Sequence, residues 1–314
     1  MKTQIQTLTT KKRKKRLTQY ELQMYSLWII PLLLVFVFSY LPMAGIVIAF
    51  KNYKYDLGIF GSEWVGLKNF EFFFKSDVFA RITWNTLSMN FMFILFGTVI
   101  SILFAILLFE LKSRIGIKTF QTVMITPHFI SWVIVAYMVY ALLNSQYGIV
   151  NSIRSSMGLE KIDWYGRAEF WPVILVISNV WKTFGMNCVM YYAALMGIDS
   201  SMFEAAEIDG ANKVQVIGSI VLPMLVPMIT ILTIMSIGNI FRADFGLFYN
   251  VPRNIGMLYK TTDVIDTYIF RTMREVGDMG MSSAVGLLQS VVGMVLVIVT
   301  NTTVKKIDAD SALF

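Results

Sequence analysis

The residue type least expected in its surroundings is Lys182, the one clear charge in the middle of a long apolar segment. Asn179 and Met186 lie three and four positions away, so the three share one face of a predicted helix. A lysine inside a membrane is costly, and it usually marks either a path for a polar solute or a fixed partner. Lys182 therefore lines such a path or pairs structurally with a carbonyl group or with a carboxylate of another chain.

Further polar and aromatic side chains accompany this lysine. Asn187 and Tyr191 continue the same segment, and Ser236 and Asn239 stand near the end of the next one. Hydrogen-bonding groups placed among apolar and aromatic faces are typical of sites that hold a small polar molecule such as a sugar. We predict a solute path lined by Asn179, Lys182, Met186, Asn187, Tyr191, Ser236 and Asn239.

Residues for bond-making chemistry are scarce. The chain has one histidine, His128, and one cysteine, Cys188, so a Ser-His-Asp triad, a His/Cys metal site and an internal disulfide are all disfavoured. No phosphate-binding G-x-x-x-x-G-K-[ST] motif occurs. His128 follows Pro127 and is interpreted as a packing residue rather than a proton relay. The sequence indicates neither an enzyme nor a bound cofactor.

The elements that must position these residues are long apolar helices. The chain is 56% hydrophobic and 15% charged, with a mean hydropathy of +0.63, whereas soluble domains are about 25% charged. Six stretches are long enough to cross a membrane. They lie at about 27–50, 85–109, 120–143, 170–196, 217–241 and 281–301. We predict an all-α integral membrane protein with a basic tail at 1–20, a membrane domain at 21–304 and a second tail at 305–314.

A polar loop at 199–223 separates the fourth and fifth stretches. Ser201 and Glu204 have the S-x-x-E spacing of a capping box, which predicts the start of a short helix. Asp209-Gly210 then predicts a sharp turn, because glycine accepts left-handed backbone angles. A second helix is expected from about Asn212 into the next apolar stretch, which Pro223 enters.

This loop resembles the EAA loop of ABC-importer permeases. Glu204-Ala205-Ala206, Gly210, Ile220 and Leu222-Pro223 match that motif at the expected spacings. The resemblance implies a six-span type I importer permease fold, with core spans at about 85–302 and a cytoplasmic helix that docks on an ATPase. It implies ATPase coupling by Glu204, Ala205, Ala206, Asp209, Gly210, Ala211, Gln215 and Pro223. A simpler alternative for Glu204 is that it only caps its own helix.

Other stretches resemble the carbohydrate-importer branch of these permeases. They include Trp64–Phe70 and Trp84–Leu87, while Tyr40–Met43, Ile48–Lys51 and Ser311–Phe314 resemble importers of polysaccharide fragments and complex oligosaccharides. The resemblance implies a second, related permease, two cytoplasmic ATPase subunits that bind ATP and Mg²⁺, and an extracytoplasmic sugar-binding protein. It implies no nucleic-acid partner, and the basic cluster Lys11–Arg16 is interpreted as a cytoplasmic anchor beside membrane lipid.

The orientation follows from the basic residues nearest to the apolar stretches. Several basic residues lie close to the ends of the apolar stretches on one side, namely the N-terminal cluster, Lys112, Arg114, Lys118 and Lys305-Lys306. The positive-inside rule then places both termini and the 199–223 loop in the cytoplasm of a bacterial cell. On the other side, the apolar spacing after Asp263 predicts a short amphipathic helix that lies on or dips into the outer surface, as a gate or as part of a dock for a binding protein.

One alternative from another class is a self-sufficient secondary transporter or channel. Such a protein is expected to show a charged ion path or broken helices in matched halves, and the sequence gives little sign of either.

Overall fold

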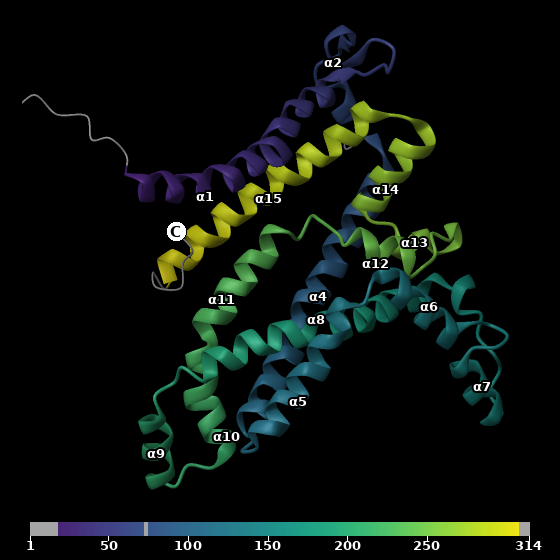
Figure 1. Cartoon of the computed structure of the whole chain (residues 1–314). Helices are drawn as coiled ribbons and strands as arrows, with labels where there is room; N and C mark the ends of the chain where they lie inside the picture. Colours follow the sequence, from purple (N-terminus) through teal and green to yellow (C-terminus); the bar gives the residue numbers. More distant parts are fainter. Residues whose placement is uncertain (1–17, 72–74, 308–314) are drawn as a thin grey trace, which may run out of the picture. The chain divides into compact units, whose positions relative to one another are not determined.

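The computed structural model describes residues 18–71 and 75–307, so the cluster at 11–16 and the C-terminal residues 308–314 lie outside them. Helices dominate the described chain (Figure 1). The chain divides into two compact units, Met1–Val47 and Ile48–Phe314.

The described part of the first unit is a continuous run of helical turns. α1 (Gln19–Val35) leads into a π-helical turn, η1 (Phe36–Tyr40), and then into the 3₁₀ helix η2 (Leu41–Phe50), which enters the second unit. Pro42, which has no amide hydrogen to donate, is the second residue of η2, whereas Pro31 lies inside α1. The apolar run Gln23–Phe50 is long enough to cross a membrane, as the first predicted span requires.

Four further runs of helix in the described part of the second unit have the length and apolarity of membrane spans. They contain α4 (Asp77–Phe109), α8 (Trp171–Leu195), α10–η7–α11 (Lys213–Val216, Ile217–Val221 and Leu222–Gly238) and α15 (Met279–Ile307). They correspond to the second, fourth, fifth and sixth predicted spans. α4 begins earlier than predicted, at Asp77, and its first turns are held by Ile82, which is fully buried against Ile265 and Val285.

The third predicted span is not one straight helix, which corrects the sequence-based expectation. α5 (Arg114–Ile125) and η4 (Thr126–Phe129) are followed by α6 (Trp132–Leu143), and the two arms are bent by 97°. Pro127 cannot donate to the preceding turn, and the extended Ser131 caps α6 by accepting a hydrogen bond from the Ile134 amide. The described chain has five candidate spans, or six if this bent pair is counted as one.

Short elements connect the spans. Between η2 and α4 lie β1 (Lys51–Asn52), α2 (Gly58–Gly61), β2 (Glu63–Trp64) and η3 (Lys68–Phe70), with β1 and β2 antiparallel and Lys51 opposite Trp64. Between α6 and α8 lie α7 (Ile149–Ser156), η5 (Trp164–Gly166) and η6 (Ala168–Phe170). The 199–223 loop carries α9 (Ser200–Ile208) before α10. Between α11 and α15 lie α12 (Phe245–Asn250), η8 (Gly256–Leu258), α13 (Tyr259–Thr262), α14 (Ile265–Arg271) and η9 (Thr272–Val276).

The core of the second unit forms around α8, which packs along α4. α5 also approaches α8 closely, because a Cβ atom at Gly185 would lie 1.9 Å from the Met124 carbonyl oxygen. One buried cluster surrounds Trp171, at the start of α8, and another surrounds Leu195, at its end. We call these two ends of the unit the α12 end and the α9 end, after the short helices beside them.

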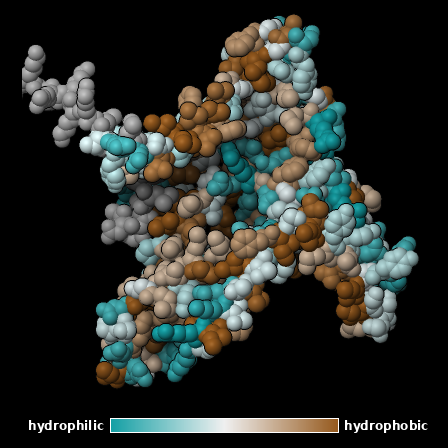
Figure 2. Space-filling model, viewed as in Figure 1, coloured by the Kyte–Doolittle hydropathy of each residue, from teal (hydrophilic) through white to brown (hydrophobic). Residues whose placement is uncertain are grey.

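Large apolar side chains remain exposed on the long helices, among them Leu103, Val173 and Ile298. Figure 2 shows apolar surface spread over the face in view rather than confined to one patch. Such exposure fits a chain whose long helices are solvated by lipid.

Candidate functional site

The α9 end of the second unit carries a compact, well-capped loop. α9 begins at Ser200, one residue before the position expected from the sequence, and its N-cap is Asp199. The Asp199 carboxylate accepts a hydrogen bond of 3.0 Å from the Ser201 amide, and this bond lowers the Asp199 pKa. The predicted capping box between Ser201 and Glu204 is therefore wrong, because the cap comes from the residue before the helix.

The turn and the second helix agree with the sequence. α9 ends at Ile208, and Gly210 has a φ of +71°, a backbone angle that branched residues resist. The Ala211 amide donates back to the Ala206 carbonyl at 2.9 Å, which closes the end of the helix. A capping box is present here, where Asn212 and Gln215 exchange bonds of 2.8 and 3.0 Å and start α10.

Two contacts fix the loop to the helices of the second unit. Phe203 packs against Phe109 with ring centroids 5.5 Å apart, and the Lys213 ammonium pairs with the Glu110 carboxylate. Both partners lie at the end of α4. A force on this loop therefore reaches α4 by side-chain contacts, and it reaches α11 by continuous helix.

The face of α9 that points away from these contacts is exposed. Glu204 and Ala205 are exposed, Ile208 at the end of α9 is 86% exposed, and Val214 on the neighbouring α10 is 78% exposed. Among the residues that the structure describes, the Glu204 carboxylate has no hydrogen-bond or ion-pair partner, so it does not cap its own helix. A carboxylate beside exposed apolar side chains on a rigid helix is suited to docking on another protein. Sequence analysis missed Ile208 and Val214, although apolar residues in a polar loop were a usable signal.

The eight residues predicted for coupling lie together in this loop, but they differ in their surroundings. Ala206 and Ala211 are half-buried, Asp209 and Gly210 form the exposed turn, and Gln215 is occupied in the capping box. Pro223 stands in the first turn of α11, directly after the π-helical turn η7. It cannot donate an amide hydrogen to the preceding turn, which accounts for the change of helix type there.

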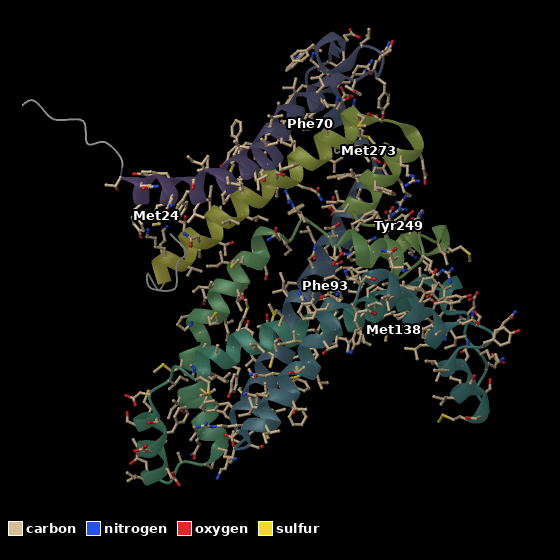
Figure 3. The ribbon with its side chains drawn as sticks, in the orientation of Figure 1. Met24, Phe70, Phe93, Met138, Tyr249 and Met273 are labelled. Carbon is tan, nitrogen blue, oxygen red and sulfur yellow. The ribbon has the colours of Figure 1, made fainter. Side chains whose placement is uncertain are left out.

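A cavity of about 520 Å³ lies between α4, η4, α8 and the end of α11. Six of the seven residues predicted for the solute path line it, namely Asn179, Met186, Asn187, Tyr191, Ser236 and Asn239. Sequence analysis missed Asn90, Phe93, Thr98, His128, Thr183, Arg242 and Asp244, which line it as well. Figure 3 labels Phe93 on α4, the helix that supplies much of this unpredicted wall.

Lys182 is the one predicted path residue that does not line the cavity. Its ammonium donates to the carbonyl oxygens of His128 and Ile130, both at 2.6 Å, and to that of Pro127 at 3.4 Å. These carbonyl groups lie at the break between α5 and α6, where that of Pro127 also accepts a hydrogen bond of 3.2 Å from the Ile130 amide. Of the two roles left open by the sequence, the geometry favours the structural pairing with carbonyl groups.

The polar groups of the cavity fall into two sets. Asn90, Ser236 and Asn239 donate their hydrogen bonds to main-chain carbonyl groups of their own or neighbouring helices. In the described part of the chain, the side chains of Asn179 and Asn187 have no such partner. Free carboxamides beside Met and Phe side chains can hydrogen-bond the hydroxyl groups of a solute.

The two charged groups of the cavity are also engaged. Arg242 donates to the Ser290 hydroxyl at 3.1 Å. Asp244 accepts from the Trp132 indole at 2.6 Å and caps α12 through the Leu247 amide. His128 is exposed to the cavity rather than packed in the core, which corrects the interpretation from the sequence. Its position at a helix break, directly after Pro127, was the available signal.

The segment after Asp263 is buried at its start, in α14, whereas residues 273–276 are exposed. Asp263 is 2% exposed, pairs with Arg271 at 2.5 Å and lies 3.7 Å from Arg81. Asn85 donates to the carbonyl groups of Lys260 and Asp263, at 3.1 and 2.9 Å, which anchors α13 and α14 on α4. The predicted helix is present as α14, and it dips into the protein at its start while Arg274 and Glu275 of η9 stay exposed. Its role as a gate or as part of a dock stays a prediction.

A group of three or more His, Cys, Asp or Glu side chains that could hold a metal ion is not found within residues 18–71 and 75–307.

Comparison with known proteins agrees over nearly the whole chain. The polygalacturonan/rhamnogalacturonan transport system permease protein YteP of Bacillus subtilis (strain 168) is 34% identical over 297 residues, which cover 94% of this chain and 92% of YteP. Protein LplB of the same organism is 33% identical over 287 residues, which cover 91% of this chain and 90% of LplB.

Solved structures give the same result. One chain in the crystal structure of a bacterial ABC transporter involved in the import of the acidic polysaccharide alginate has a TM-score of 0.83 at 32% identity, and the match covers 92% of this chain and 97% of that one. A second crystal structure, with a TM-score of 0.82, shows the bacterial alginate transporter in complex with an alginate pentasaccharide-bound periplasmic protein. Residues 97–308 match the family described as the binding-protein-dependent transport system inner membrane component, and this chain belongs to that family.

Proposed function

We propose that this chain forms half of the path of an ATP-driven importer for oligosaccharides or polysaccharide fragments. The observation that carries the proposal is the cavity beside α8, where Asn179 and Asn187 present carboxamides that have no side-chain partner among the described residues. The named relatives and the alginate importer support a saccharide as the solute. As a member of this permease family, the chain leaves ATP hydrolysis to a partner subunit.

The proposed partners bind at the two ends of the second unit and along the solute path. The exposed face of α9 is proposed to dock on one of two cytoplasmic ATPase subunits, which bind ATP and Mg²⁺. A second, related permease completes the path, and an extracytoplasmic binding protein delivers the oligosaccharide. The complex with a periplasmic protein in the alginate importer supports this last partner. Both termini and α9 are proposed to face the cytoplasm of a bacterium, as the basic residues near the α9 end suggest.

The coupling step uses the contacts of the loop. When the ATPase subunits close on ATP, they move α9, and Phe203 and Lys213 transmit the motion to the end of α4. α10 and η7 continue into α11, whose Ser236 lines the cavity. Both walls of the cavity therefore respond to one displacement, which opens the path alternately to the two sides of the membrane.

The test is uptake by the complete complex in liposomes, with a set of labelled acidic and neutral oligosaccharides. Asn187→Leu removes a free donor from the cavity and should lower uptake at least tenfold while leaving the yield of complex unchanged. Val173→Leu, at a lipid-exposed position of the same helix, is the matched control. Uptake by this chain alone, without the ATPase, would instead identify a secondary transporter or channel.

A further inference from the structure

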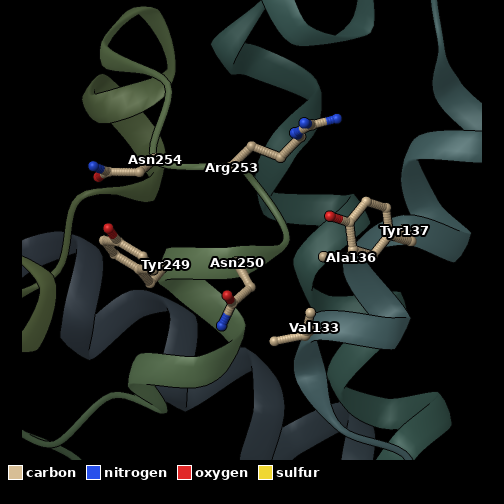
Figure 4. Close-up of a pocket in the computed structure, with 7 residues that line it drawn as sticks. All are labelled: Val133, Ala136, Tyr137, Tyr249, Asn250, Arg253 and Asn254. Atoms are coloured by element: carbon tan, nitrogen blue, oxygen red, sulfur yellow. The ribbon is translucent and has the colours of Figure 1, made fainter.

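Arg253 lies between two cavities at the α12 end. One, of about 210 Å³, is lined by Val133, Ala136, Tyr137, Tyr249, Asn250, Arg253 and Asn254 (Figure 4). The other, of about 640 Å³, is lined by Tyr140, Asn144, Ser145, Gln146, Tyr165, Arg253 and Ile255. Arg253 is the residue that they share, and neither cavity shares a lining residue with the cavity beside α8.

The backbone holds Arg253 in an unusual conformation. Arg253 and Asn254 have φ angles of +58° and +50°, which non-glycine residues rarely adopt. The side chain of Asn254 is fixed by hydrogen bonds from the Tyr259 hydroxyl at 2.8 Å and from Arg271 at 3.3 Å. Arg271 is itself paired with the buried Asp263. A strained pair that its surroundings hold this firmly indicates a functional constraint on the direction of Arg253.

The guanidinium group is stacked but not neutralised. Its central carbon lies 4.3 Å from the centre of the Tyr140 ring, so one face of the group rests on an aromatic surface. The ion pairs of the described chain do not include Arg253, and its side chain is exposed. Stacking leaves the edge of the group free, and that edge carries paired N–H donors that match the two oxygens of a carboxylate.

The surroundings suit a sugar. Tyr137 and Tyr165 add aromatic faces, and Asn250 offers a carboxamide oxygen, because its nitrogen donates to the Gly246 carbonyl. Tyr165 contacts Tyr140 edge to face, with ring centroids 5.6 Å apart. An arginine between aromatic rings and amide groups provides for both the carboxylate and the ring of an acidic sugar.

We propose that Arg253 and the two cavities beside it form a binding site for the carboxylate of an acidic sugar residue in an oligosaccharide. The inference rests on the proposed function and adds to it a charge class and a second place of contact. The site lies at the end of α8 opposite to α9, which is the side from which solute enters in the proposed orientation. An oligosaccharide is long enough to occupy such an entry site before it reaches the cavity beside α8.

The test uses the complete complex in lipid nanodiscs, without binding protein, and titrates trigalacturonate and its fully methyl-esterified form by ligand-observed NMR. Arg253→Gln should weaken binding of trigalacturonate by about tenfold or more and leave the ester unchanged, because only the former has carboxylates for the guanidinium. Arg167→Gln removes an exposed charge from the same end outside both cavities and should change neither. Tyr140→Leu should act like Arg253→Gln, whereas Tyr140→Phe keeps the ring and should bind normally.

Two results would overturn the proposal. One is equal affinity of the native complex for trigalacturonate and its ester. The other is an Arg253→Gln complex that binds trigalacturonate normally but whose ATP hydrolysis is stimulated less by binding protein, whichever oligosaccharide that protein carries. That result would mean that the guanidinium faces an acidic side chain of the binding protein. Basal ATP hydrolysis, unchanged in each variant, shows that the complex is intact. Failure of the complex to import any oligosaccharide would count against the proposed function alone, since the titration does not depend on transport.

Discussion

Replacing Lys182 with Met tests whether this lysine serves the backbone or the solute. Met keeps the length and apolar stem of the side chain but removes the ammonium. The groups that lose their donor are the carbonyl oxygens of His128 and Ile130, each 2.6 Å from the ammonium, and more weakly that of Pro127 at 3.4 Å. The lysine also lies 5.3 Å from the centre of the Trp132 ring, a contact that Met largely keeps.

The expected cost comes from the two short bonds. A buried carbonyl group left without a donor costs about 1–3 kcal/mol, so two of them cost roughly 2–6 kcal/mol. The His128 side is open to the cavity, where water can replace the lysine, which places the expected value in the lower half of that range. Even this is a large share of the roughly 5–15 kcal/mol that stabilises a typical domain.

The assay separates assembly from transport. Lys182→Met should lower the yield of complex that co-purifies with the ATPase and should reduce its thermal midpoint by several degrees. Uptake per assembled complex should stay near normal. Lys182→Arg retains donors for the carbonyl groups and should recover part of the yield, and Thr183→Val is the control for a neighbour that lines the cavity. Normal yield and thermal midpoint with strongly reduced uptake would refute the structural role.

Three further predictions concern other parts of the second unit. Glu204→Ala should sharply reduce co-purification of the ATPase and leave the permease fold intact, since this carboxylate is exposed and has no partner among the described residues. Gly210→Val should impair both the co-purification and the fold of the loop, because residue 210 has a φ of +71°. Equal, mild losses of co-purified ATPase in the two variants would argue against coupling through α9. Burial raises the pKa of Asp266, although the Ala243 amide offsets this in part, so its contribution to stability is lost as pH rises through the raised pKa. Asp266→Asn should therefore reduce the fall of the thermal midpoint as pH rises above about 4, the ordinary pKa of an Asp side chain, and an unchanged profile would contradict this. Tyr165→Phe removes a buried hydroxyl that has no hydrogen-bond partner, so thermal unfolding should show unchanged or higher stability, by up to about 1 kcal/mol; a clear loss would mean that the hydroxyl is bonded.

The presence and approximate place of five spans could be predicted because a membrane requires long apolar helices, whatever their neighbours. The third predicted span differs in geometry, because it bends near Pro127. A single proline in an apolar run predicts a kink, but its angle depends on which groups satisfy the freed carbonyls. Here Lys182 supplies the donors from another helix, and the arms bend by 97°. That pairing involves residues 52 to 55 positions apart, which no local pattern reveals.

The polar loop was predicted in outline for a similar reason. Asn212 caps a helix that begins at the next residue, and Gly210 forms a turn with its neighbours, so both roles follow from local spacing. The start of α9 was placed wrongly because Asp199, Ser200 and Ser201 are all good N-cap residues. Only the backbone angles decide among them. The unpredicted wall of the cavity, including Asn90 and His128, comes from α4 and η4, whose positions beside α8 are set by packing.

Most polar side chains in the spans serve the backbone, and this separates the cavity residues by function. Lys182 and Gln289 donate to carbonyl groups where a helix ends or breaks, and Asn90 does so although it lines the cavity. Each of these bonds satisfies a carbonyl group that lipid could not solvate. A polar side chain in a span is free for a solute only where no backbone group needs it. Asn179 and Asn187 meet that condition within the described cavity, and the charge of a mid-span residue alone, as in Lys182, does not indicate it.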